Sequence, residues 1–419
     1  MATTPDVEHS VTVERKSTLY WRLLQNPSLL LLWSGETVSV FGDEFFLLAA
    51  TWVVYIQSNS ILQTALIQVV WHLDRLIFSP LAGVLADRWN RKWMMVVTNL
   101  FSALVVGALA AWFALKGPFT PVAIFATVFL LNSLATFYAP ASLAVLPEMV
   151  GKDALTTTSG LFSTAFQLVS IAGSALAGVV IASFGTMWAL IIDAITFVYA
   201  MVAIRLAQIP QAPIEPRKQN SLHRDFLDGW NVLAGLPVVW ALTWLGVFLN
   251  VAAFMGPLYP ALVRQQLHGD AAVLGLVATL SGIGALCAGV CAGPLERAFG
   301  GGRLTAAAWS LAGISILGMA FSTIIPLTAF LEAVRAFGIT IGSISSSALM
   351  QGQLPQEYRG RGVGIIRWVS VVAIPLSALL GGWLADRLGV GTLFAVGGAW
   401  ILGISAVAWF NRHLRKAHL

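Results

Sequence analysis

Long apolar segments, separated by short polar turns, run through almost the whole chain. A membrane-spanning helix needs about 20 mostly apolar residues, and the pattern predicts twelve such helices. The turns between them carry helix-breaking residues, such as Gly117-Pro118, Gly185, Gly269-Asp270 and Gly389. The approximate limits of the predicted helices are 28–56, 61–85, 93–115, 120–147, 155–184, 187–207, 237–262, 272–295, 304–323, 326–350, 363–385 and 391–411.

The composition agrees with an all-α membrane protein. The chain is 58% hydrophobic and 10% charged, whereas a soluble domain carries about 25% charged residues. The surplus of five positive charges is explained by the placement of the basic residues in the loops on one side of the membrane. We therefore expect no nucleic-acid partner.

The placement of lysine and arginine predicts the orientation in the membrane. Of the 24 lysines and arginines, Arg75 and Arg335 lie within apolar segments, and only Lys116, Arg264 and Arg387 lie in loops on the side opposite the termini. All the others are on the side of the termini, and cytoplasmic loops are the ones enriched in these residues. We therefore expect a multi-pass protein of the plasma (inner) membrane with both termini in the cytoplasm.

The longest polar stretch between apolar segments divides the chain into two halves. Residues 208–235 contain Pro210, Pro213 and Pro216, and residues 222–233 have the pattern of an amphipathic helix. We interpret 208–235 as a cytoplasmic linker between two six-helix bundles, 26–207 and 236–412, which is a typical arrangement of transporters with internal repeats. Residues 1–25 and 413–419 are the predicted cytoplasmic tails.

A charged motif follows the second apolar segment. It consists of a glycine, three intervening residues, an Asp-Arg pair and then two more cations. Such charges are costly beside a lipid core, so we expect a tight turn at the membrane face. The pattern resembles the loop between helices 2 and 3 of the major facilitator superfamily. It consists of Gly83, Asp87, Arg88, Arg91 and Lys92.

One position of this motif departs from the family pattern. Asn90 stands where the family usually has glycine, and asparagine also tolerates the left-handed backbone. The resemblance implies the major facilitator fold, alternating access, and a role for this loop as a gate. The simpler alternative is an ordinary positively charged cytoplasmic loop.

The first predicted helix contains three acids. Glu36 and Asp43 are seven residues apart and therefore lie on one face, two turns apart, while Glu44 is about 100° further round the helix. Ionisable groups within a membrane are functional candidates because they are costly there. The stretch from Ser39 to Asp43 and the segment 78–83 resemble the exporter branch that includes macrolide and enterobactin efflux proteins.

The second predicted helix contains His72, Asp74 and Arg75 near mid-membrane. One interpretation is structural, with Arg75 pairing with Asp43 or Glu44. The other is that the acids exchange protons during transport, since a buried carboxylate must be either paired or partly protonated. The sequence leaves both open.

Further polar groups lie in other predicted helices. Asp193 falls in helix 6, and Asn250 in helix 7 is a candidate hydrogen-bonding group of a cavity. Glu332 and Arg335 are three residues apart on helix 10, so we expect them to neutralise each other. Trp71 is a candidate for an apolar cavity wall.

Two glycine-containing stretches complete the pattern. Residues 173–178 resemble the glycine-rich helix 5 motif of facilitator antiporters, but Ser174 stands where proline is usual. Residues 382–387 repeat the glycine-acid-arginine pattern on the predicted outer side, and we interpret them as a turn signal.

These observations predict a monomeric secondary transporter that exports an amphipathic small molecule across the bilayer by proton antiport. Glu36, Asp43 and Asp74 would carry the proton or bind a cationic solute. No nucleotide-binding pattern or nucleophile set occurs, and Cys287 and Cys291 without histidine partners form a weak metal site. We therefore expect no enzyme activity, no cofactor and no metal. A lysophospholipid or siderophore transporter of the same fold, or a non-transporting membrane sensor, remains an alternative.

Overall fold

The computed structural model describes residues 25–117, 120–210, 235–354 and 359–415. The predicted amphipathic linker helix lies outside the described residues, as do residues 1–24 and 416–419 of the two predicted tails. The same holds for the side chains of Arg75 and Asp87 and for the burial of Gly83, although the backbone of all three belongs to a described helix.

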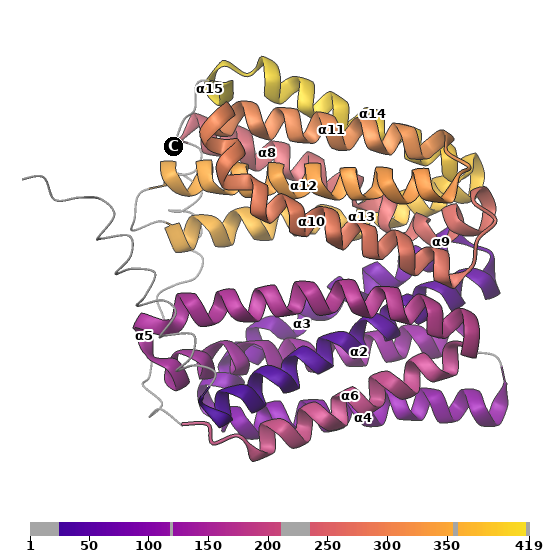
Figure 1. Ribbon diagram of the computed structural model, residues 1–419, viewed down its shortest axis with the longest axis vertical. Helices are drawn as coiled ribbons and strands as arrows, with labels where there is room; N and C mark the ends of the chain where they lie inside the picture. The colour runs from indigo at the N-terminus through magenta and orange to yellow at the C-terminus, as the bar shows by residue number, and fades with distance from the viewer. Residues whose placement is uncertain (1–24, 118–119, 211–234, 355–358, 416–419) are drawn as a thin grey trace, which may run out of the picture.

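The first half of the chain folds into one group of packed helices (Figure 1). Its longest helical element contains two predicted spans, which meet at the non-helical residue Gly151 with no longer loop between them. Gly151 has a φ of 73°, which only glycine adopts without strain, and it kinks the helix there. The helices are α2 (Pro27–Ser58), α3 (Ile61–Arg88), α4 (Arg91–Lys116), α5 (Pro121–Phe184) and α6 (Thr186–Leu206).

The second half forms a similar group. Its first span is interrupted, because Pro257 and Pro260 lack the N–H that a regular α-helix needs. That span consists of α8 (Pro237–Val251), the 3-10 helix η1 (Ala252–Leu258), α9 (Tyr259–Ala261) and the π-helix η2 (Leu262–Gln266). The others are α10 (Ala271–Phe299), α11 (Gly301–Phe321), α12 (Ile325–Gln353), α13 (Arg359–Leu388), α14 (Val390–Phe410) and the short α15 (Arg412–Arg415).

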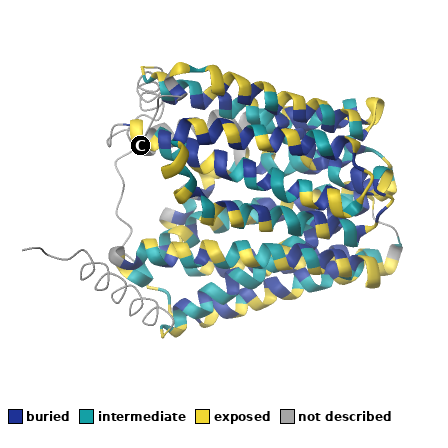
Figure 2. Cartoon of the chain, turned by 45° about the horizontal axis from the view of Figure 1, so that its top comes forward, coloured by how far each residue is buried: buried dark blue, intermediate teal, exposed yellow. Residues whose placement is uncertain are grey.

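The helices are long and apolar enough for a multi-pass membrane protein. Within the described ranges, 11 spans meet this criterion, and α13, with 30 residues, supplies the twelfth. Exposed residues line the helices along their whole length (Figure 2), and many of them are large and apolar, such as Leu104, Val290 and Phe410. The predicted all-α fold with twelve transmembrane helices is confirmed.

The two groups of helices meet at the end of the molecule away from the chain termini (Figure 1). There α5 crosses α10 at two glycines: a Cβ built on Gly178 would lie 2.7 Å from the carbonyl oxygen of Ala271, and one on Gly275 would lie 2.6 Å from that of Ser174. Gln265 also donates a hydrogen bond of 2.7 Å to Tyr55. This close contact closes the space between the groups at that end.

The charged motif differs in part from its prediction. Residues 83–88 belong to the last turns of α3 rather than to a loop, and the turn is confined to Trp89 and Asn90. Asn90 is not left-handed: its φ is −65°, and its side chain accepts a hydrogen bond of 3.0 Å from the Trp93 N–H. Asparagine is favoured at this N-cap position because it satisfies a free backbone N–H.

Candidate functional site: a central cavity and a cavity within the first bundle

A cavity of about 640 Å³ lies between the two groups of helices, and we call it the central cavity. Both halves of the chain contribute to its wall, which is largely apolar with a few polar groups, as is typical of small-molecule sites. The residues most important for its chemistry are Glu44, Trp71, Gln167, Tyr259, Glu332 and Arg335.

Two hydroxyl groups of the described residues hold Glu44 in the wall of the central cavity. Ser170 donates a hydrogen bond to one carboxylate oxygen, and Ser174 donates one of 2.8 Å to the other. Ser174 is the residue that replaces the proline usual in the helix 5 motif, so this substitution supplies a partner for Glu44. The sequence predicted no partner on α5 for this acid.

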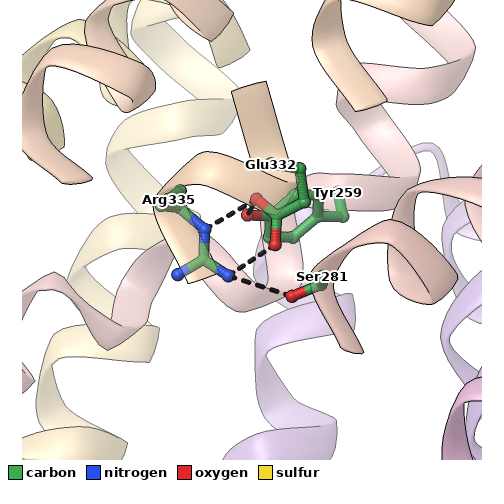
Figure 3. A network of polar contacts seen from close by, with 4 residues as sticks. All are labelled: Tyr259, Ser281, Glu332 and Arg335. Atoms are coloured by element: carbon green, nitrogen blue, oxygen red, sulfur yellow. Dashed lines mark hydrogen bonds and ion pairs between the residues drawn. The ribbon is translucent and has the colours of Figure 1, made fainter. Parts of the chain in front are cut away.

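On the opposite side of the cavity, a polar network surrounds the expected ion pair of α12 (Figure 3). The Arg335 guanidinium donates two hydrogen bonds to the carboxylate of Glu332, at 2.6 and 2.5 Å, and a longer one of 3.4 Å to Ser281. The Tyr259 hydroxyl donates a further bond of 2.5 Å to Glu332. The two charges therefore neutralise each other.

The charge of the central cavity follows from these contacts. Because the charges of Glu332 and Arg335 cancel, Glu44 is the one acid of the wall, within the described part of the chain, that has no cation among its hydrogen-bond partners. The side chain of Arg75 lies outside the described part of the chain. Among the described groups, the cavity therefore presents one carboxylate outside an ion pair, in largely apolar surroundings.

A second cavity, of about 500 Å³, lies within the first group of helices, and we call it the bundle cavity. Glu36 and Asp43 both line it, in keeping with their seven-residue spacing, and Asp43 is exposed to it. Asn99 and Asn132 add polar groups to its wall. Trp71 lines both cavities, so its indole separates them.

Glu36 is held in the same manner as Glu44. It is 8% exposed, and Tyr138 and Ser142 donate hydrogen bonds of 2.8 and 2.5 Å to the same carboxylate oxygen. Each of these acids of α2 is therefore bound by two hydroxyl groups that lie four residues apart on α5.

Two other predicted acids are fully buried. Asp193 lies behind Gly42 on α6, and neither of its carboxylate oxygens has a hydrogen-bond donor among the described residues. Asp74 accepts one hydrogen bond of 2.7 Å from Thr136, and its other oxygen lacks a described donor. Buried carboxylates with so few donors are costly in the charged form.

The remaining predicted site residues lie elsewhere. Asn250 is in the last turn of α8, where the span becomes a 3-10 helix, and it is not among the residues that line the central cavity. Arg91 forms an ion pair with Glu148, and Lys92 donates a hydrogen bond of 2.7 Å to the Ala207 carbonyl. Arg88 is exposed at the end of α3. These cations lie at the end of the molecule that carries the termini.

Sequence reasoning missed the hydroxyl residues that hold the acids. A usable signal exists, because Tyr138 and Ser142, like Ser170 and Ser174, are spaced i and i+4 and must share a helix face. That spacing alone does not say which acid they meet, since α2 and α5 are far apart in the sequence. No local sequence pattern predicted that Tyr259 and Ser281 would contact the ion pair of α12.

The comparison with known families identifies the chain. A family model described as transmembrane secretion effector matches residues 19–418. The chain belongs to this family. It is thus a major facilitator transporter of the efflux branch, as the sequence motifs predicted, and a multi-pass integral membrane protein.

Two relatives of the chain are efflux proteins. Macrolide efflux protein A of Streptococcus pyogenes is 25% identical over 400 residues, covering 93% of this chain and 96% of that protein. The multidrug efflux pump Tap of Mycolicibacterium fortuitum is 27% identical over 417 residues, covering 94% and 98%. Because the family and these relatives are transporters, the expectation that the chain is not an enzyme is confirmed.

Solved structures support the fold. A bacterial homologue of the iron transporter ferroportin, in its inward-facing state, has a TM-score of 0.72 at 18% identity and covers 94% of this chain and 99% of that one. The nucleoside transporter NupG has a TM-score of 0.68 at 12% identity and covers 91% and 99%. At such identities the likeness concerns the architecture alone.

Proposed function

We propose that this transporter exports an amphipathic small molecule with a cationic group, in exchange for protons. The observation that carries the proposal is Glu44, a carboxylate held by two serine hydroxyls in the largely apolar wall of the central cavity. A lipophilic monocation would pair with this acid and place its apolar part against Trp71. The efflux relatives favour export over import.

The proton would be carried by the acids of the first bundle. Asp43 is exposed to the bundle cavity, where a carboxylate is accessible to protons yet separated from the substrate by Trp71. Glu36 lines the same cavity, and Asp74 and Asp193 are buried close to it with too few donors. Protonation of one of these acids would remove the cost of a buried charge, which gives the proton a way to favour one conformation.

The orientation and the gate follow from charge placement. With the termini in the cytoplasm, as the distribution of lysine and arginine predicts, the contact between the bundles would close the central cavity on the outer side. Substrate would then enter from the cytoplasm. The charged motif would contact the second bundle when the inner side closes. This motif consists of Gly83, Asp87, Arg88, Arg91 and Lys92.

We further propose that bundles 26–207 and 236–412, joined by linker 208–235, move as units. We also propose that the transporter works as a monomer.

The test uses purified protein and a fluorescent lipophilic monocation such as ethidium. Binding is measured in detergent, and export in proteoliposomes with an imposed proton gradient. Replacing Glu44 by Gln removes the charge with little change in shape, so we expect binding to weaken about tenfold or more, equal to about 1.4 kcal/mol or more. Glu296→Gln is the matched control, since Glu296 is a glutamate of α10 that does not line either cavity.

The outcomes separate the parts of the proposal. If Glu44→Gln binds ethidium as well as the parent protein does, Glu44 does not recognise the cation. If a proton gradient of either direction leaves export unchanged, the proposal of proton coupling is wrong, but the proposal of export is not contradicted. If no lipophilic solute moves under any gradient, the non-transporting sensor becomes the better hypothesis.

A further inference from the structure

A basic pocket opens between α4 and α6 at the end of the molecule that carries the termini. Its volume is about 660 Å³. Lys92 at the start of α4 and Arg205 at the end of α6 contribute two positive charges, and Asn90 and Gln208 contribute polar groups. None of the described residues that line this pocket is an acid.

Both cations remain available for a ligand. The Lys92 ammonium donates one hydrogen bond, to the Ala207 carbonyl at the end of α6, and has two further N–H groups. The Arg205 guanidinium lies 5.8 Å above the centre of the Trp93 ring. The ion pairs of the described residues are Arg91 with Glu148 and Arg335 with Glu332, so neither pocket cation is neutralised by one of them.

An apolar groove of about 480 Å³ adjoins the basic pocket. The two share Asn90 and Trp93, so the Trp93 ring forms the border between charged and apolar walls. The groove continues into an exposed apolar stripe of α4 that faces away from the bundle interior, formed by Val97, Phe101 and Leu104. The apolar wall of the groove is completed by Leu85, Trp89, Met94 and Phe137.

We propose that the basic pocket and the apolar groove together bind one anionic phospholipid. The phosphate would lie between Lys92 and Arg205, and one acyl chain would follow the groove along α4. Along this surface, the charged pocket is followed by the Trp93 indole ring, a side chain typical of the membrane interface, and then by the apolar groove. The chemical groups of a phospholipid follow the same order, from the charged headgroup through the interface to the apolar acyl chains. A basic pocket between membrane helices is a known mode of headgroup binding, and the predicted cytoplasmic side is where anionic lipids are enriched. This inference is independent of the proposed substrate.

The experiment measures lipid binding to the full-length, delipidated protein by native mass spectrometry. Phosphatidylglycerol and phosphatidylcholine with identical acyl chains are compared at low and high salt. We expect phosphatidylglycerol to bind more tightly, and salt to reduce the difference. The double variant Lys92→Gln/Arg205→Gln should lose about thirtyfold in affinity for phosphatidylglycerol, from about 1 kcal/mol for each cation.

The matched control is Arg297→Gln/Arg303→Gln, which removes two exposed arginines from the corresponding end of the second bundle and should leave this binding event unchanged. If the double variant misfolds, Lys92→Arg/Arg205→Lys keeps both charges and should retain the preference. Equal binding of the two lipids, or equal effects of the two double variants, overturns the proposal. Glycerol phosphate that competes as strongly as the whole lipid also overturns it, since the groove would then contribute nothing.

Discussion

The carboxylate of Asp386, in the last turn of α13, accepts a hydrogen bond of 2.7 Å from the hydroxyl of Ser60, which is the N-cap of α3 in the other bundle. The same carboxylate accepts bonds from the backbone N–H groups of Ile61 and Leu62, at 2.6 and 3.2 Å. An acid at a helix N-terminus is stabilising. Residues 382–387, which the sequence presents as a turn signal, thus join the two bundles.

This contact predicts that Asp386→Ala favours opening at the end away from the termini. Hydrogen bonds to a charged group are worth about 1.5–3 kcal/mol, so the ratio of closed to open molecules should fall about tenfold or more. The measurement is the distance between spin labels placed on the ends of α3 and α13. Asp270→Ala is the control, because Asp270 caps its own helix at the same end. If Asp386→Ala leaves the ratio of closed to open molecules unchanged, the prediction is contradicted.

The crossing of α5 and α10 leads to a second prediction. Gly178→Ala places a methyl group 2.7 Å from a backbone carbonyl oxygen and 2.9 Å from the Cα of Gly275, so the helices must separate there. We expect a lower melting temperature and a shift toward opening at this end. Gly289→Ala is the matched control, since its Cβ would have no neighbour within 4 Å and alanine favours the helix. A melting temperature that is equal in the two variants would argue against close packing at Gly178.

The ion pair of α12 provides a third prediction. Arg335→Gln leaves Glu332, which is 2% exposed, without its cation, and breaking a buried pair on one side costs about 3–5 kcal/mol. The yield of folded protein, measured by size-exclusion chromatography, should fall sharply. Glu332→Gln in the same molecule should restore it, because no charge is then left unpaired. Low yield of the double variant would show that the pair does more than neutralise charge.

A fourth prediction concerns Asp43. If Asp43 carries the coupled proton, Asp43→Asn should abolish transport driven by a proton gradient, while substrate exchange at equilibrium, which moves no net proton, survives. If Asp43 instead serves as the structural partner of Arg75, the variant should have a low yield, and Arg75→Gln should restore it. Both rates are measured in the same proteoliposomes. Full gradient-driven activity of Asp43→Asn rules out the coupling role.

A fifth prediction concerns the orientation. In a cysteine-free background, single cysteines at positions 217 and 116 should react with a membrane-impermeant reagent from opposite sides of oriented cells. Arg217 lies in the predicted cytoplasmic linker and Lys116 in a predicted outer loop. Labelling of both from the same side would contradict the predicted topology.

The sequence by itself determined the features that depend on local pattern. Segment length and hydropathy determined the spans, which is why the predicted helix ends near Gly185 and Gly389 agree with the structure. The helical repeat determined that Glu36 and Asp43 share a face and that Glu332 can reach Arg335. It did not determine that the two spans of α5 would meet directly at Gly151, because a glycine between two helices is compatible with a longer loop as well as with a break of one residue.

Only the tertiary structure decided what each polar group meets. Asp43 and Glu44 are neighbours in the sequence, yet one lines the bundle cavity and the other the central cavity, since adjacent helix positions face different partners. The serines that hold Glu44 are more than a hundred residues away, and the N-cap that meets Asp386 is in the other bundle. Such contacts depend on how whole helices pack against one another, and no local spacing encodes that packing.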